Sequence, residues 1–225
     1  MTASEVAPDL WCLRNRGFAS NTWVARLADG SALVVDPGLD GDGLGELLEA
    51  LTLRPSLVCC THGHFDHIAG VARLKASFGA SLRIMAAERK VVQTANFTMM
   101  VCKVSGRIEI PRFDVEVEDG HVEPWGGDVV QWTHTPGHTP GSAFVRWRDR
   151  VFTGDTLYRD GVGLVQFPGE SPDLLRDSIL KIWDTLPDTS LICPGHGRPG
   201  AFGTIKRENT ALRAFLGLAP TPAPG

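Results

Sequence analysis

Three histidines and an aspartate occur within six residues of one another in the segment THGHFDH (61–67). His62 and His64 are two positions apart, and side chains at this spacing in an extended segment point to the same side. Asp66 and His67 follow at the start of a predicted helix. Imidazole and carboxylate groups suit zinc, iron or manganese better than calcium. Because the motif lacks cysteine, we expect an open, catalytic metal site rather than a closed structural one.

Three more candidate ligands each follow an apolar strand and have a glycine beside them. His138 lies in THTPGHTPGS, Asp155 ends VFTGD, and His196 lies in PGHG. Glycine lets the backbone turn sharply, so that a ligand side chain can point inward. Sites at strand ends are the common arrangement in α/β folds. Together with THGHFDH, the three residues form one candidate set.

Two segments of the chain resemble each other. LVCCTHGH (57–64) and LICPGHG (191–197) are both apolar strands that run into a glycine-flanked histidine. Chance similarity and internal duplication are both open as explanations. A duplication would place the two strand ends at the same edge of the molecule.

The elements that must position these residues alternate between strands and helices. An Asp-Gly pair after Ala28 predicts a hairpin between the first two strands. Ser171 is a predicted helix N-cap, with Pro172 at the first helical position. Residues 86–114 have no clear pattern, although 86–97 could form a helix. The predicted strands are 21–27, 31–36, 57–60, 81–85, 115–119, 128–134, 142–148, 150–155 and 190–193, and the predicted helices are 42–51, 68–79, 172–186 and 205–218.

Composition excludes several classes of partner. The 225 residues carry a net charge of -4 without a run of Lys or Arg, so we expect no nucleic-acid partner. No apolar stretch approaches transmembrane length and the start has no signal-peptide pattern, so we expect no membrane partner. Five cysteines without CxxC spacing indicate reduced thiols and a cytoplasmic location. We expect one domain over residues 1–217 and a disordered tail over 218–225.

The motifs HxHxDH, TPGHTPGS, FTGDT and PGHG, in this order, resemble the metallo-β-lactamase fold superfamily. The resemblance extends from VVDPG to PGHG and implies an α/β fold, a four-layer αββα sandwich with two metal sites at one sheet edge. Asp36 in VVDPG matches a position that would orient the ligand loop. The implied ligands are His62, His64 and His138 for the first metal, Asp66, His67 and His196 for the second, and Asp155 as the bridge.

Two divalent ions at such a site imply hydrolysis. Ions about 3.5–4 Å apart can hold a bridging hydroxide at neutral pH. That hydroxide would attack a carbonyl group, and Asp66 would orient it. Zinc is the expected metal, with iron and manganese as the alternatives.

Among the members of this superfamily, the chain most resembles the short glyoxalase II-like (hydroxyacylglutathione hydrolase-like) proteins. THGHFDH, HTPGHTPGS, FTGDTLY, FPGE and PGHG all match that group, which implies hydrolysis of a small-molecule thioester or ester. Only 29 residues follow His196, too few for the helical domain of glutathione-specific members. We expect a monomer or a homodimer.

Two other activities stay open. Acyl-homoserine lactonases have a tyrosine three residues after the bridging aspartate, where Tyr158 lies in this chain. Its hydroxyl could donate a hydrogen bond to the developing oxyanion. Mono-iron persulfide dioxygenases use the equivalents of three of the ligands, but their GCGRTDF-like segment reads GVGLVQF here (161–167).

The segment ANFTMMVCKV (95–104) is the sequence most relevant to substrate choice. Its apolar residues have two interpretations, a soft wall above the metals or the core face of a helix. The residues concerned are Phe97, Met99, Met100 and Val101.

Overall fold

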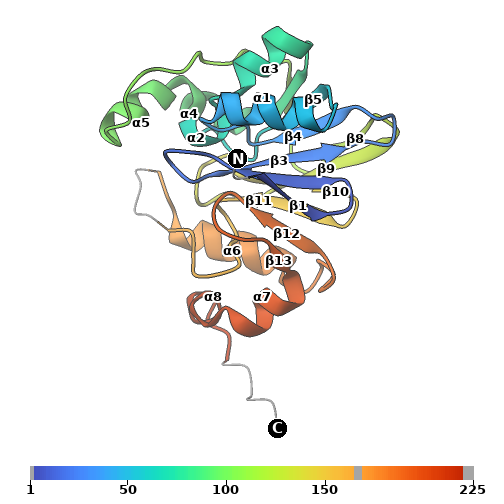
Figure 1. The fold of residues 1–225 in the computed structure, drawn as a ribbon. Coiled ribbons are helices and arrows are strands. Elements are labelled where there is room, and N and C mark those ends of the chain that lie inside the picture. Colours follow the sequence, from blue (N-terminus) through green and yellow to red (C-terminus); the bar gives the residue numbers. More distant parts are fainter. Residues whose placement is uncertain (1–2, 165–168, 220–225) are drawn as a thin grey trace.

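The computed structural model describes residues 3–164 and 169–219, and in them two β-sheets pack face to face between two groups of helices (Figure 1). This arrangement confirms the predicted α/β class and the four-layer αββα sandwich. The first sheet has the order β1 (Ala3–Ala7), β2 (Leu10–Arg14), β3 (Asn21–Arg26), β4 (Ala32–Val35), β5 (Pro55–Cys59), β6 (Ser81–Met85), β7 (Val115–Val117). The second has the order β13 (Gly200–Ala201), β12 (Leu191–Pro194), β11 (Arg150–Gly154), β10 (Ala143–Trp147), β9 (Asp128–His134), β8 (Val122–Trp125).

The helices cover the outer faces of the two sheets. Those on the first sheet are α1 (Gly41–Ala50), α2 (Phe65–Ile68), α3 (Val71–Phe78), the 3-10 turn η1 (Ala86–Glu88), α4 (Arg89–Gln93) and α5 (Ala95–Val101). Those on the second are α6 (Pro172–Trp183), α7 (Phe202–Glu208) and α8 (Thr210–Phe215). Within the described residues, no helix combines the length and the apolar character needed to cross a bilayer.

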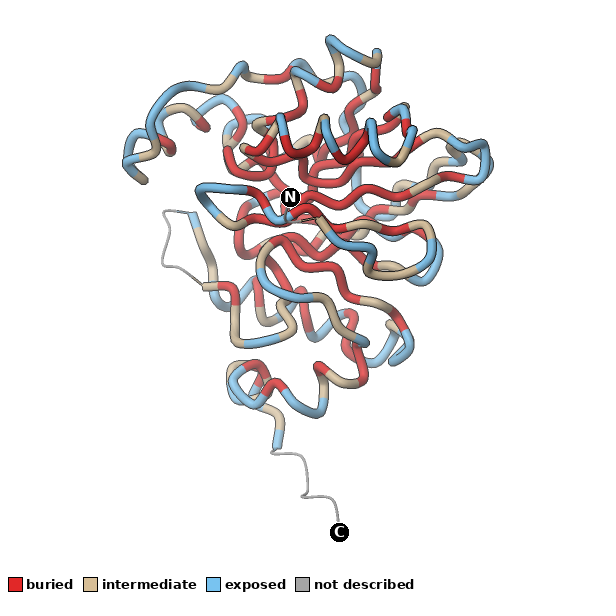
Figure 2. Tube along the Cα trace, viewed as in Figure 1, coloured by how far each residue is buried: buried red, intermediate tan, exposed pale blue. Residues whose placement is uncertain are grey.

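Three clusters of buried side chains hold these elements together. Figure 2 colours the buried residues red along the chain. Side chains that alternate along a strand point to opposite faces. On β3, Trp23 packs between the sheets, while its neighbour Val24 packs under the helices of the first sheet. From the second sheet, Trp132, Trp147 and Phe152 fill the same inner layer, and all three are fully buried.

Parallel strand pairs bring the candidate residues to one edge. β4 and β5 are parallel, and so are β11 and β12. The carboxyl ends of parallel strands lie at the same edge of a sheet, so Asp36 and Thr61 emerge side by side, as do Asp155 and the loop with His196. A backbone bridge between Ser20 and His196 joins the two sheets at this edge.

The structure differs from the predicted elements in four places. Strands β1, β2, β8 and β13 were not expected. In place of one helix over 68–79, the short α2 ends at Ile68 and α3 spans Val71–Phe78. The region 86–114, in which only 86–97 was considered as a helix, contains η1, α4 and α5, and α5 extends to Val101.

The expected closing helix over 205–218 is two helices. Asn209 separates α7 from α8, and its side chain accepts a hydrogen bond from the Leu212 N–H. Ser171 is the N-cap of α6, as predicted, and accepts from the Leu174 N–H. In the predicted tail, Leu218 packs against the third core, and 220–225 lie outside the described residues.

Candidate metal centre

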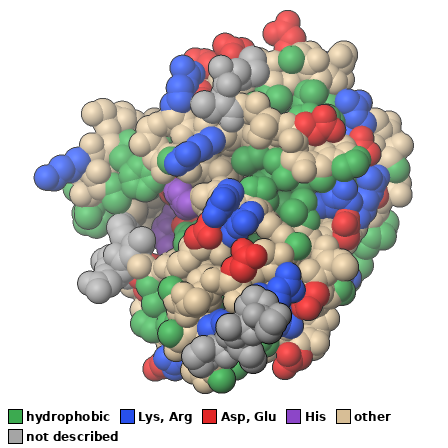
Figure 3. All heavy atoms as spheres, turned by 60° about the horizontal axis from the view of Figure 1, so that its bottom comes forward, with side chains coloured by type: hydrophobic (Ala, Val, Ile, Leu, Met, Phe, Trp, Pro, Cys, Tyr) green, Lys and Arg blue, Asp and Glu red, His purple; other side chains and the backbone are tan. Residues whose placement is uncertain are grey.

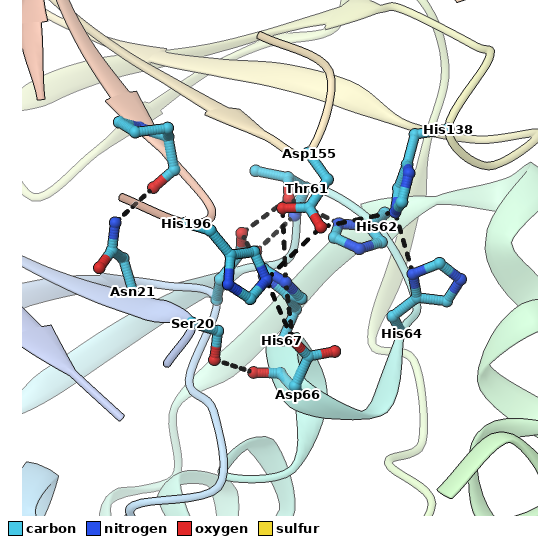
Figure 4. A network of polar contacts seen from close by, with 12 residues as sticks. Ser20, Asn21, Thr61, His62, His64, Asp66, His67, His138, Asp155 and His196 are labelled. Atoms are coloured by element: carbon cyan, nitrogen blue, oxygen red, sulfur yellow. Dashed lines mark hydrogen bonds and ion pairs between the residues drawn. The ribbon is translucent and has the colours of Figure 1, made fainter. Parts of the chain in front are cut away.

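The motif THGHFDH forms a tight loop between β5 and α2. Cys59 ends the strand, and Phe65 begins the helix. His64 lies at the N-cap position with extended backbone, so the chain turns directly from strand to helix. Its four candidate ligands therefore point into one small volume at the sheet edge (Figure 4).

The first predicted ligand set is assembled in the structure. His62, His64 and His138 each offer a nitrogen, and these nitrogens all lie within 4.8 Å of one another. His138 comes from the loop between β9 and β10, and its Nε2 lies 3.0 Å from Nδ1 of His64. The three rings meet edge to face, with centroids 4.8–4.9 Å apart.

The second predicted set is assembled beside the first. Oδ2 of Asp66 lies 3.3 Å from Nε2 of His67 and 3.3 Å from Nε2 of His196. His196 reaches this point from the loop after β12. The ligand atoms of this set also lie within 4.8 Å of one another.

Asp155 lies between the two sets. Its Oδ2 is 3.5 Å from Nε2 of His138 in the first set and 3.6 Å from Nε2 of His196 in the second. Its Oδ1 is 3.6 Å from Nε2 of His67. The structure thus brings all seven predicted ligands together, with one carboxylate in the bridging place.

Asp36 positions the loop 61–67, which carries four of the candidate ligands. Its carboxylate accepts hydrogen bonds of 2.7 Å from both the backbone N–H and the hydroxyl of Thr61. Oδ2 also lies 3.2 Å from Nδ1 of His67. This contact directs Nε2 of His67 toward the centre, an arrangement common around metal-binding histidines. Asp36 itself has a φ of 51°, a left-handed conformation unusual for a non-glycine residue.

Two glutamates support the histidines, and sequence reasoning missed both. Oε1 of Glu170 lies 3.1 Å from Nδ1 of His138. Glu88, fully buried, accepts 2.6 Å hydrogen bonds from the N–H groups of Gly63 and Gly141. Glu170 stands in the FPGE segment, which offered a weak signal, whereas no motif marks Glu88.

Glycine is required at one point of the centre. A Cβ on Gly195 would overlap the Asp155 carboxylate and come within 2.8 Å of the His67 ring. The PGHG loop can therefore approach the bridging carboxylate closely only because this residue lacks a side chain.

Unpaired buried atoms show that this constellation fits divalent ions. Nε2 of His62, Nε2 of His67 and Oδ1 of Asp155 are buried and have no hydrogen-bond partner among the described residues. Such atoms are rare, because an unsatisfied buried polar group is costly. All three point into the same centre, and imidazole and carboxylate are suitable ligands for zinc or iron. Two ions bound in this centre would give each of these three atoms a partner.

Burial and neighbouring charges set the protonation of the centre. Burial lowers the pKa of His62 and brings that of His64 to about 4, so both are neutral and able to bind a metal. Burial alone would raise the pKa of Asp66, but His67 and His196 lower it well below its usual value. Burial alone would lower the pKa of His67, but Asp66 and Asp155 raise it well above its usual value.

A pocket of about 440 Å³ opens onto the centre. In Figure 3 the histidines are visible in a hollow, with hydrophobic side chains on one side and charged side chains on the other. Ten described residues line it: Phe18, His64, Phe65, Asp66, Thr98, Cys102, His138, Asp155, Tyr158 and His196.

The core interpretation of the apolar residues of α5 is confirmed for Met99 and is wrong for the other three. Met99 is buried in the core of the first sheet's helices. Phe97, Met100 and Val101 are exposed and none of them lines the pocket. Thr98 and Cys102, one helical turn apart, face the pocket instead.

Tyr158 lines the pocket. Its ring is 6.4 Å from that of His196. Burial raises the pKa of Tyr158 well above its usual value, and the charge of Asp155 raises it further. The phenol is therefore a hydrogen-bond donor. The two remaining histidines lie elsewhere: His134 contacts the Pro140 carbonyl, and His121 packs on Trp132.

Comparison with known proteins identifies the family of this chain. Residues 15–196 match the family described as the metallo-beta-lactamase superfamily. An uncharacterized protein of Mycobacterium tuberculosis is 34% identical over 213 residues, which are 88% of this chain and 95% of that protein. The hydroxyacylglutathione hydrolase GloC of Haemophilus influenzae is 30% identical over 192 residues, which are 82% of this chain and 88% of GloC.

Solved structures agree with the fold. The B3 metallo-beta-lactamase BLEG-1 superimposes with a TM-score of 0.82 at 27% identity, over 90% of this chain and 99% of that one. TTHA1623, in a di-iron-bound form, gives a TM-score of 0.79 at 27% identity, over 88% of this chain and 98% of that one. With the family match over most of its length, the chain belongs to the metallo-β-lactamase superfamily and is one of its hydrolases.

Proposed function

We propose that this protein is a dinuclear metal-dependent hydrolase that cleaves a small-molecule thioester or ester. The observation that supports this proposal most is the position of Asp155, within 3.6 Å of histidines from both ligand sets. A single-ion site has no need of a second set of ligands on the far side of that carboxylate. The similarity to GloC, named as a hydroxyacylglutathione hydrolase, favours a thioester.

The ions would be held by His62, His64 and His138 on one side and by Asp66, His67 and His196 on the other. When bound, two divalent ions supply Lewis acidity that activates water and polarises a carbonyl group. Against the effect of burial, its two histidine neighbours hold the pKa of Asp66 low, so its carboxylate stays ionised and can orient a water by accepting a hydrogen bond from it.

Lactone hydrolysis is a second candidate, which Tyr158 favours. Its phenol lines the pocket beside His196 and stays protonated, so it can donate a hydrogen bond to an oxyanion. The same phenol could donate to the oxyanion formed from a thioester. Tyr158→Phe should lower kcat most on the substrate class whose oxyanion the phenol contacts, so kcat of this variant is compared on thioesters and lactones.

Zinc is the proposed metal, and the di-iron form of TTHA1623 makes iron the first alternative. A mono-iron persulfide dioxygenase would leave the second ligand set without a role. We also propose that the protein acts on a small molecule, as a monomer or homodimer, in the cytoplasm, where its five free cysteines would stay reduced.

Metal analysis and a substrate panel test the proposal. The purified protein, loaded with Zn²⁺ or Fe²⁺, is assayed on thioesters, lactones and β-lactams, and on a persulfide with an oxygen electrode. We expect two metals per chain and metal-dependent thioester turnover. One iron per chain with oxygen uptake on the persulfide would overturn the hydrolytic proposal.

The variant Asp66→Asn should lower kcat by about 10²–10⁴-fold, the usual contribution of a positioned acid or base. His134→Ala is the matched control, because His134 lies outside the centre, and it should retain full activity and metal content. Metal content of Asp66→Asn is measured alongside, which separates loss of the carboxylate that orients the water from loss of bound metal.

A further inference from the structure

The pocket above the metal centre has walls of one chemical character. Phe18, in the loop between β2 and β3, packs edge to face on Phe65, with ring centroids 5.0 Å apart. Thr98 and Cys102 of α5 form another side, and Tyr158 a third. Beyond the candidate ligands, the lining is therefore aromatic or weakly polar.

No cation lines this pocket. None of the ten described lining residues is Lys or Arg, and the sequence VQFP at 165–168 contains neither. Arginines near the lining residues in sequence are engaged elsewhere. Arg16 pairs with Asp40 and Arg198 with Asp160, and Arg159 donates to the Pro199 carbonyl and pairs with Glu208. Lys103, which follows Cys102, is exposed. A carboxylate at the far end of the substrate's acyl chain, away from the metal ions, would be desolvated in this pocket without an opposite charge, which is unfavourable.

From these walls we infer that the acyl part of the substrate is an uncharged, apolar chain that lies between the Phe18–Phe65 pair and α5. The inference rests on the proposed function and narrows its substrate class. A volume of about 440 Å³ is within the range of small-molecule sites and accommodates more than an acetyl group. The carbonyl carbon would lie at the ligand histidines, and the chain would extend toward Phe18.

Two series of ligands test the inference on the Zn²⁺-loaded protein. The first is a set of N-acetylcysteamine thioesters from acetyl to hexanoyl, with glutaryl as a charged counterpart of pentanoyl. The second is the set of free carboxylates from acetate to hexanoate, whose binding is measured by calorimetry. We expect kcat/KM and affinity to rise about fourfold per added methylene, the factor that corresponds to about 0.8 kcal/mol. Glutaryl thioester should be turned over at least about tenfold less efficiently than pentanoyl.

Variants test which residues cause the dependence of kcat/KM on the length of the acyl chain. Phe18→Ala should reduce the ratio of hexanoyl to acetyl kcat/KM by about tenfold, because it removes one wall of the pocket. Val129→Ala is the matched control, since Val129 is an exposed residue of β9, and it should leave that ratio unchanged. S-Pentanoyl glutathione is assayed with the parent protein and with Lys103→Ala, to test whether Lys103 recognises the leaving group. We expect the parent protein to have the same kcat/KM on this substrate as on the pentanoyl thioester of N-acetylcysteamine.

The outcomes separate the inference from the proposed function. Turnover of acetyl thioester without any gain along either series would overturn the apolar-chain inference and leave the hydrolase proposal standing. Absence of thioester turnover, with carboxylate affinity that still rises with length, would overturn the thioesterase proposal and support the pocket's preference. Better turnover of glutaryl than of pentanoyl would contradict the inference directly.

Discussion

Glu88 connects the two loops that carry the first ligand set. Its oxygens accept 2.6 Å hydrogen bonds from the N–H groups of Gly63, between His62 and His64, and of Gly141, three residues after His138. Burial raises the pKa of Glu88, although these two N–H groups act to lower it. The carboxylate therefore fixes the separation of loops from different sheets without itself reaching a ligand atom.

Glu88→Gln should weaken metal binding by about 10–100-fold, the usual effect of losing a residue that orients metal ligands. Glutamine has nearly the same shape, but its amide group would place N–H donors against the Gly63 or Gly141 N–H. Affinity is measured by competition with a chelator, and the exposed Glu49→Gln on α1 is the control. If both variants bind metal as the parent does, Glu88 is not a positioning residue.

Residues of the centre differ in how far the sequence could indicate them. His62, His64, Asp66 and His67 share one short motif, so their proximity follows from chain connectivity. Glu88 has no such mark, because its role exists only where η1 meets two distant loops. Glu170 is similar, since its contact with His138 depends on the fold of the chain between them.

At the scale of elements, apolar periodicity predicted the long, regular helices and strands well. It failed where a polar residue divides a continuous pattern. Asn209 is the clearest case, because 205–218 is apolar at helical spacing yet forms α7 and α8. The Asn209 side chain caps α8 at the Leu212 N–H and donates to the Gly161 carbonyl at 2.8 Å. It also lies 3.4 Å from the Tyr158 carbonyl, so the break connects the closing helices to the pocket.

Asn209→Ala should lower the free energy of unfolding by about 0.5–2 kcal/mol, the usual range for loss of an N-cap. The change is measured by urea denaturation of the metal-loaded protein. Thr210→Ala, an exposed position one residue later, should have a smaller effect. We also expect KM to rise in Asn209→Ala, because Tyr158 loses a backbone contact. Equal stability of the two variants would show that the cap contributes little.

At the scale of the molecule, the metal centre joins the two halves of the sandwich. His62, His64, Asp66 and His67 extend from the first sheet, and the other three ligands extend from the second. Four motifs spread over the chain predicted this convergence through their resemblance to one superfamily. The face-to-face packing that enforces it depends on long-range contacts among residues such as Trp23 and Phe152, which local patterns do not indicate.

Because its ligands come from both sheets, metal should stabilise the whole fold, and the effect should depend on pH. Ligand binding at about 100 times Kd stabilises a protein by about 2.7 kcal/mol. The pKa of His67 is raised well above its usual value by Asp66 and Asp155, against the effect of burial. A raised pKa in the folded state gives stability that is present at low pH and is lost as the pH rises through that pKa. The contribution of His67 to the stability of the metal-free protein should therefore be lost with rising pH, whereas the lowered pKa values of His62 and His64 act in the opposite sense only up to about pH 6.5.

The metal-loaded protein has no such proton to lose, since an ion must displace it. The difference in Tm between the loaded and metal-free forms should therefore increase from about pH 6 to about pH 8, as expected when ligands must be deprotonated. Scanning calorimetry with and without a chelator measures this difference. Asp155→Asn removes the bridging carboxylate and should abolish the difference in Tm, whereas His134→Ala should preserve this difference. A difference that is constant or shrinks with rising pH would contradict the assignment of His67 as a ligand whose proton the metal replaces.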